Sequence, residues 1–275
     1  MLRLPLASTA AALAALSFAS SALSTPKPLL AYSFNESTAS YPSVGTWPIT
    51  LRGFGEKQKA GAPGSGVSGR TDDRAWDASA NEGQGTSQPL NSSGLVAAQP
   101  GPELAGLKAF TLSFWFKTEQ SFAQDSATRF LMLSDRPAEP VSRGMVLRSH
   151  RGALELRIGG ISPEGEGTPM EVVVASTRFR EGVGYHRTHT WVFVAITWDG
   201  SEVRFHVGDA HAAIASAGSG PFVGRIVEEQ ANLVLCNTRS LNRGLDGWLD
   251  NFRFHDVALS VADLDTLRRT DLGQP

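Results

Sequence analysis

The sequence predicts an all-β protein, an antiparallel β-sandwich that ends in a short C-terminal helix. Two observations support this prediction. Apolar and polar residues alternate with a period of two in several segments, as in strands that bury one face. The 28 glycines and 15 prolines suit a fold with many turns. A hydrophobic fraction of 41% over 275 residues is enough for a substantial core, and sandwiches of this size commonly form one domain.

The first 24 residues are predicted to be a secretory signal peptide rather than part of the fold. Arg3 supplies a positive charge, residues 4–16 are apolar and rich in Ala and Leu, and Ala22-Leu23-Ser24 offers small residues for cleavage. We expect cleavage after Ser24, which leaves residues 25–275 as a single domain. A buried N-terminal helix is the alternative. No apolar run approaches membrane-spanning length, so we expect a secreted protein, extracellular or periplasmic, with no membrane span.

The strands can be predicted in order along the chain. In the segment 110–117, four large apolar residues fall on one face, and Trp115 falls on the other face with Thr, Ser and Lys. Segment 191–207 predicts a hairpin, because Asp-Gly separates two alternating runs and Gly takes positive φ without strain. In its return strand, Arg204 and His206 point away from the core. Further strands are expected at 29–34, 130–134, 144–149, 153–158, 171–177, 232–236 and 247–254, with long loops at 52–70 and 77–102.

The pattern changes to helical near the C-terminus. Ser260 can cap a helix, and Asp263 stands three residues later as a capping-box partner. Leu264 and Leu267 would then face the sandwich, and two arginines in the last turn suit the negative end of the helix dipole. We therefore expect two or three helical turns that pack against a sheet.

Charge and cysteine content exclude some classes of function. The formal net charge is −2 and there is no basic stripe, so we expect no nucleic-acid partner. Cys236 is the only cysteine, so no internal disulfide can form. Its apolar neighbours predict a buried thiol in a strand rather than a nucleophile.

Several segments, in order, resemble the laminin G-like (LamG) domains of the concanavalin A-like lectin/glucanase superfamily. Segments 30–36, 74–79, 110–118 and 191–208 carry the likeness, and the most specific is 245–260, LDGWLDNFRFHDVALS, which follows the family pattern FNGLIDDVRIYNRALS. The resemblance covers about residues 29–267 and implies a two-sheet antiparallel jelly-roll sandwich. It implies less about function, because this fold carries lectins, adhesion modules, glycan-binding appendages and some enzymes.

The resemblance also implies a calcium site. Alternation along 247–254 predicts Asp250 on an inward face with three aromatic residues, where a carboxylate needs a partner. The family pattern points to this acid and the end of the first strand, so the expected Ca²⁺ ligands are Asn35 and Asp250, with Asp77 nearby. Asn35 and Asn251 stand where acids are usual, which lowers the expected affinity. The alternative is that Asp250 accepts hydrogen bonds from loop backbone amides.

A carbohydrate site would need aromatic faces and polar side chains. Trp115, Arg204 and His206, all predicted on the non-core side of their strands, are the candidate ligand-binding residues, and Trp47 and Tyr41 lie in or near a loop. The alternative is that Trp115 and Trp47 are buried under the long loops as ordinary packing. An exposed Trp115 would favour a glycan-binding function, and a covered one would favour a structural role.

The predicted function is therefore a secreted, non-catalytic binding module for an extracellular glycan or protein, with calcium as a structural ion. A structural or adhesive component of an extracellular assembly is the alternative. A glycoside hydrolase is less well supported, because the sequence contains no Glu-x-Asp-x-x-Glu string, which would place two acids beside one scissile bond.

Overall fold

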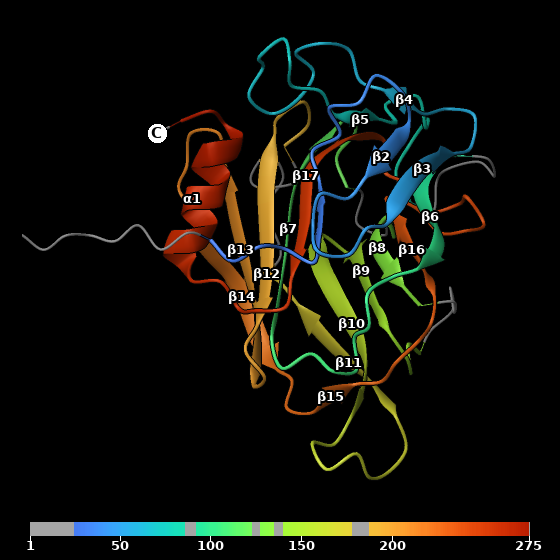
Figure 1. Ribbon diagram of the computed structural model, residues 1–275, viewed down its shortest axis with the longest axis vertical. Helices are drawn as coiled ribbons and strands as arrows, with labels where there is room; N and C mark the ends of the chain where they lie inside the picture. The colour runs from blue at the N-terminus through green and yellow to red at the C-terminus, as the bar shows by residue number, and fades with distance from the viewer. Residues whose placement is uncertain (1–24, 86–91, 123–126, 135–139, 178–186, 275) are drawn as a thin grey trace, which may run out of the picture.

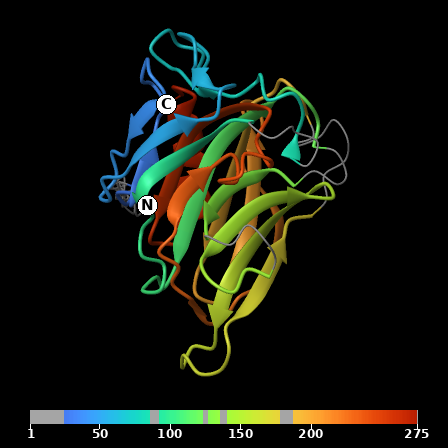
Figure 2. The ribbon, with the colours of Figure 1, turned by 90° about the vertical axis from the view of Figure 1, so that its right-hand side faces the viewer.

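Two antiparallel sheets pack face to face in this computed structural model, and one helix lies on the outside of the sandwich (Figures 1 and 2). The structure describes residues 25–85, 92–122, 127–134, 140–177 and 187–274. The predicted leader, residues 1–24, lies outside the described residues. The all-β sandwich with a C-terminal helix is confirmed. Among the described residues, no helix is long and apolar enough to cross a membrane.

The first sheet, called sheet A, has the strand order β14-β13-β12-β7-β17-β5-β4, and β1 pairs with β17 beside β5. Neighbouring strands in it are antiparallel. Its strands are β1 (Leu30–Tyr32), β4 (Lys59–Ala60), β5 (Trp76–Asp77), β7 (Phe110–Thr118), β12 (Val192–Trp198), β13 (Glu202–Asp209), β14 (Ala215–Pro221) and β17 (Gly247–His255).

The second sheet, called sheet B, has the order β11-β10-β9-β8-β16-β6-β3-β2, and the short β15 pairs with β10. Its strands are β2 (Ser40–Pro42), β3 (Thr50–Phe54), β6 (Gly94–Pro100), β8 (Arg129–Leu133), β9 (Met145–His150), β10 (Ala153–Ile161), β11 (Met170–Ala175), β15 (Arg225–Ile226) and β16 (Asn232–Leu235). Strands far apart in sequence are therefore neighbours, as in β17 against β7 and β6 against β16.

The core between the sheets is rich in aromatic rings, as the alternation along 110–117 predicts. Phe110 packs against Trp198 with ring centroids 5.6 Å apart, and Phe114 packs against Phe130 at 5.4 Å. The indole N–H of Trp198 donates to the carbonyl of Phe222 at 2.9 Å, so burial leaves no polar group unpaired there. Each such fully buried ring contributes about 1.5–3 kcal/mol relative to an exposed one.

The C-terminal helix α1 (Val261–Asp271) forms as predicted, with Ser260 as the N-cap and a complete capping box with Asp263. Leu264 is fully buried against Trp115 and Phe193 on the outer face of sheet A. This cluster is separate from the main core. The helix therefore closes part of the face that simple alternation leaves open to solvent (Figure 1).

The prediction of long loops at 52–70 and 77–102 is partly wrong. Strand β6 lies inside the second one and pairs with both β3 and β16, so it is central in sheet B. Its sequence, Gly-Leu-Val-Ala-Ala-Gln-Pro, shows no strong alternation of apolar and polar residues, so the strand was not predicted. Only Leu95 and Ala97 of this strand enter the main core. Cys236 is fully buried, as predicted, and burial raises the pKa of its thiol well above the ordinary value.

Candidate functional site

A β-bulge in strand β17 decides where the most informative carboxylate lies. Pairing with β7 shifts register between Asp250 and Arg253, and Asn251 takes a φ of 48°. Simple alternation predicts Asp250 on the same inward face as Phe252, and the bulge makes this prediction wrong. Phe252 enters the core, whereas Asp250 pairs with Trp115 and lies on the outer side of sheet A.

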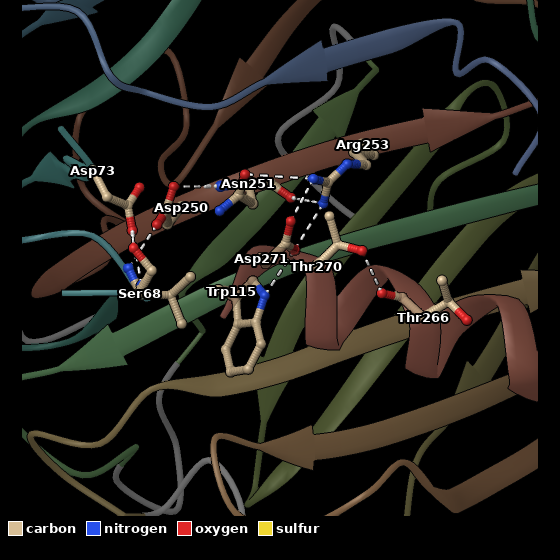
Figure 3. Close-up of polar contacts among 10 residues, drawn as sticks. Ser68, Asp73, Trp115, Asp250, Asn251, Arg253, Thr266, Thr270 and Asp271 are labelled. Carbon is tan, nitrogen blue, oxygen red and sulfur yellow. Dashed lines mark hydrogen bonds and ion pairs between the residues drawn. The ribbon is translucent and has the colours of Figure 1, made fainter. Parts of the chain in front are cut away.

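Asp250 is nevertheless fully buried, because the loop that contains Val67 covers it. The Val67 N–H donates to its Oδ2 at 2.9 Å, and the Asn251 N–H donates to its Oδ1 at 2.7 Å (Figure 3). Burial raises the pKa of this carboxyl well above its ordinary value, and the negative charge of Asp73 raises it further. These contacts correspond to the alternative in which Asp250 fastens a loop to the sheet.

Asp271, the last residue of α1, clamps the helix onto two strands. Its carboxylate accepts hydrogen bonds from both terminal nitrogens of Arg253, at 2.8 and 2.5 Å. It also accepts one from the indole nitrogen of Trp115 at 2.9 Å (Figure 3). A bidentate guanidinium–carboxylate pair is among the stronger polar contacts in proteins, and this carboxylate is only 2% exposed.

The clamp corrects the prediction for Trp115. Its ring is completely buried, edge-on to Phe193 at 5.2 Å between centroids, and its one polar atom is used by Asp271. Trp115 therefore offers no face to a ligand in this structure. It lies on the non-core side of β7 as predicted, but α1 covers that side.

Beside the clamp lies a hollow of about 220 Å³, here called the polar basin. The loop after β4 orients its acids, since the Ser68 N–H and hydroxyl both donate to Asp73 Oδ2, at 2.8 and 2.7 Å. The Arg74 N–H likewise holds Asn35 Oδ1 at 2.7 Å. The basin is lined by Asn35, Ser68, Arg70, Asp72, Asp73, Asn251, Thr270, Asp271 and Gly273.

Of the three predicted calcium ligands, one lines the basin, one is buried near it, and one lies elsewhere. Asn35 lines the basin, and Asp250 lies close enough to Asp73, another basin residue, for their charges to interact. Asp77 is engaged elsewhere, because its Oδ1 accepts from the backbone and hydroxyl of Ser79, and its Oδ2 lies 3.6 Å from Lys59 Nζ. Asp73, which sequence analysis did not single out, lines the basin, whereas Asp77 does not.

The donors at the basin fit a hard cation in type, since carboxylate and amide oxygens are what calcium prefers. Asp73 would supply a carboxylate, and Asn35 and Asn251 would supply amide oxygens. Asp250 does not line the basin, and both of its oxygens already accept backbone N–H groups. The described residues contain no group of three or more His, Cys, Asp or Glu side chains placed to hold a metal ion. A cation here would therefore depend on amide or backbone oxygens as well as on Asp73.

Arg204 and His206 do not join the basin. Arg204 points outward as predicted, but its guanidinium lies 2.6 Å from both Asp199 Oδ2 and Glu202 Oε2. His206 is buried, and burial lowers the pKa of its imidazole, with the Arg204 charge adding to the effect. Tyr41 lies in β2 and is buried, and Trp47, in the loop that follows, is 38% exposed.

The fold and this site can now be set beside known proteins. A family model described as the concanavalin A-like lectin/glucanases superfamily (Laminin_G_3) matches residues 90–265, more than half of the chain. The chain belongs to this family. No curated protein matches this laminin G-like chain by sequence.

Solved structures with the same fold include toxin binding domains. The binding domain of Paraclostridial Mosquitocidal Protein 1 has a TM-score of 0.57 at 15% identity, over 90% of this chain and 55% of that one. The ligand-binding domain of botulinum neurotoxin serotype D, in complex with N-acetylneuraminic acid, has a TM-score of 0.57 at 13% identity, over 89% and 51%. This laminin G-like chain spans about half the length of these structures, and the likeness shows the fold alone.

A second buried acid, Asp246, lies in the loop that precedes β17. Its Oδ2 accepts from the Gly83 N–H at 2.8 Å, and the residue is 2% exposed. Burial raises the pKa of this carboxyl to about 6, and the charges of Glu119 and Glu82 raise it further. The folded state therefore holds its proton more tightly than the unfolded chain does.

We expect Asp250→Ala to lower the free energy of unfolding by about 1–3 kcal/mol, because the N–H groups of Val67 and Asn251 lose their acceptor inside the protein. Urea denaturation in the presence of a chelator measures this. Asp250→Asn is the matched variant and should lose less, since its amide oxygen can still accept. An unchanged unfolding free energy for Asp250→Ala would show that the carboxyl does not fasten the loop.

We expect Asp246→Asn to stabilise the protein at neutral pH and to have less effect in acid. Below the unfolded pKa, near 4, the aspartate is protonated in both states and its burial has no ionisation cost. As pH rises through about 6, the folded state must ionise a carboxyl that burial disfavours, so the wild type loses stability that the amide variant keeps. Melting temperatures at pH 4 and pH 7 test this, and an equal effect at both would contradict it.

Proposed function

We propose that the chain is a secreted, non-catalytic glycan-binding module, and that the polar basin is a place where it contacts its ligand. The leader pattern of residues 1–24 supports secretion. The observation that carries the glycan proposal is the composition of the basin, which presents carboxylate, amide and hydroxyl groups on one hollow. These are the groups that exchange hydrogen bonds with sugar hydroxyls.

The basin favours a neutral sugar, or one bridged by a cation, over a free acidic sugar. It contains Asp72, Asp73 and Asp271, and its one arginine is paired, with Arg70 Nη2 lying 3.0 Å from Asp72 Oδ2. A sugar carboxylate in this hollow would meet like charges. The basin is smaller than the roughly 300–1,000 Å³ of sites for drug-sized ligands. A single terminal sugar residue is therefore the expected occupant.

The arrangement of the basin's acids argues for binding rather than hydrolysis. A retaining or inverting glycosidase needs two carboxyls about 5–9 Å apart that both face the scissile bond. Asp271 is committed to Arg253 and Trp115, and both oxygens of Asp250 accept backbone N–H groups. Asp73 is held by Ser68. These acids are thus used to build the surface.

A structural or adhesive role is the second candidate, and the burial of Trp115 and His206 favours it. Both residues lie on the outer side of sheet A, and neither offers a ring to a sugar. A partner that binds this face would contact α1 rather than Trp115 or His206. Such a partner would be a protein rather than a glycan.

We also propose that calcium stabilises the basin by neutralising Asp73 and Asp250. The charge of Asp73 already raises the pKa of Asp250, and a divalent cation would relieve that repulsion. Added Ca²⁺ should raise the melting temperature of chelator-treated protein. The rise should grow with the ratio of the free calcium concentration to the Kd for calcium.

Asp73→Asn should weaken this calcium shift. Asp77→Asn is the matched control and should keep it, because Asp77 is bound to Ser79 and Lys59. Absence of any shift up to millimolar calcium would remove the ion from the proposal. A shift lost only in Asp77→Asn would place the ion elsewhere.

The glycan proposal is tested by applying residues 25–275 to an array of neutral and acidic oligosaccharides, in calcium and again in chelator. We expect binding to a class of neutral glycans, reduced about tenfold in Asn35→Ala, which removes an amide from the basin rim. Glu164→Gln, an exposed change outside the basin, should bind as wild type does. Silence in both conditions would favour the protein-binding alternative.

A further inference from the structure

We propose that a second glycan contact lies at the exposed indole of Trp47, in a hollow of about 400 Å³ that shares no lining residue with the polar basin. This inference takes its ligand class from the proposed function. The hollow, here called the Trp47 cleft, is lined by Trp47, Pro100, Gly101, Glu103, Glu228 and Gln230. Three segments far apart in sequence thus meet around one aromatic ring.

The segment that carries Trp47 is fixed rather than loose. It connects β2 to β3, and the Trp47 N–H donates to the carbonyl of Leu29 at 2.8 Å, while the Trp47 carbonyl accepts from Ile49 at 2.9 Å. Gly45 packs so closely on the carbonyl oxygen of Leu29 that a Cβ there would clash with it. The backbone that carries the 38% exposed Trp47 is therefore held in place, which lowers the backbone entropy lost when a ligand stacks on the ring.

The opposite wall is fixed in the same way. Glu228 Oε2 accepts from the backbone N–H groups of Leu104 and Ala105, at 2.8 and 3.0 Å. The Gly101 N–H donates to the carbonyl of Ala231 at 2.9 Å, which joins the end of β6 to the segment before β16. Glu228 Oε2 is thus used to anchor the side chain to the backbone, and this contact limits the positions that Oε1 can take.

The chemistry of the lining points to a neutral sugar. One face of a pyranose ring carries C–H groups that stack on an indole, and its hydroxyls donate to carboxylates and exchange hydrogen bonds with an amide such as that of Gln230. An acidic sugar would be repelled by Glu103 and Glu228. A cationic ligand would be expected to find several aromatic walls, and Trp47 is the one aromatic residue among the described residues of this lining.

The test measures affinity for the neutral oligosaccharide that binds best to the wild type on the array, using titration calorimetry. We expect Trp47→Ala to weaken binding about tenfold or more and Trp47→Phe to lose less, since a phenyl ring still stacks. Glu228→Gln should weaken binding while keeping the wild-type melting temperature, because its amide oxygen can still accept from Leu104 and Ala105. Val44→Ala, an exposed change in the same connection but outside the lining, is the control and should bind normally.

The outcomes separate this inference from the function on which it rests. If the wild type binds neutral glycans and Trp47→Ala binds equally well while Asn35→Ala does not, the Trp47 cleft is not a contact and the glycan proposal stands. If the wild type binds no glycan, both fall. Binding of a lysine-rich peptide that depends on Trp47 and Glu228 would overturn the sugar assignment, and binding restricted to acidic sugars would do the same.

Discussion

The bulge at Asn251 is the constraint on which the outer half of this sandwich depends. It inserts one residue into β17, so that Phe252 continues into the core while Asp250 lies on the other side of the sheet. A one-residue shift reverses the direction of every side chain that follows. After the bulge, Arg253 therefore faces outward beside Asp250, and it can receive the carboxylate of Asp271. The helix clamp and the polar basin both follow from this single irregularity.

Closure of the outer faces leaves the loops as the place of the two proposed ligand contacts. Helix α1 covers Trp115 on sheet A. On the outer side of sheet B, Arg157 bridges Glu155 and Glu171 at 3.2 and 2.9 Å. Side chains that already satisfy one another would have to be separated before they could bind a ligand, and that separation costs energy. The basin and the Trp47 cleft instead lie where connecting segments meet, and Asn35, Asp73 and Glu228 in their linings are held by backbone amides.

Local signals in the sequence were enough for the helix and for the strands with clear alternation, but they missed β6 and β14. Non-local contacts decided the rest. Ser260 and Asp263 form a capping box through contacts within one turn, so the helix could be predicted from spacing alone. The bulge could not, because Asn251 tolerates positive φ without requiring it. Asp73 is likewise placed beside Asp250 by loop closure over a large sequence separation, and no periodic pattern reports such a contact. The family resemblance named Asn35, Asp77 and Asp250; Asn35 lines the basin, Asp250 is buried near it, and Asp77 is bound to Ser79 and Lys59.

The two proposed contacts also differ in the conditions that would alter their geometry. The basin depends on acids that repel one another, since the charge of Asp73 raises the pKa of Asp250, so its shape is tied to pH and to any bound cation. The Trp47 cleft depends on backbone hydrogen bonds around Trp47 and on the Glu228 carboxylate, which accepts from Leu104 and Ala105. Its walls therefore do not depend on the acids of the basin or on a cation bound there. A ligand that spanned both would gain affinity by linking two modest contacts. Its calcium dependence would then report the basin alone, and the contribution of Trp47 would remain in the presence of a chelator.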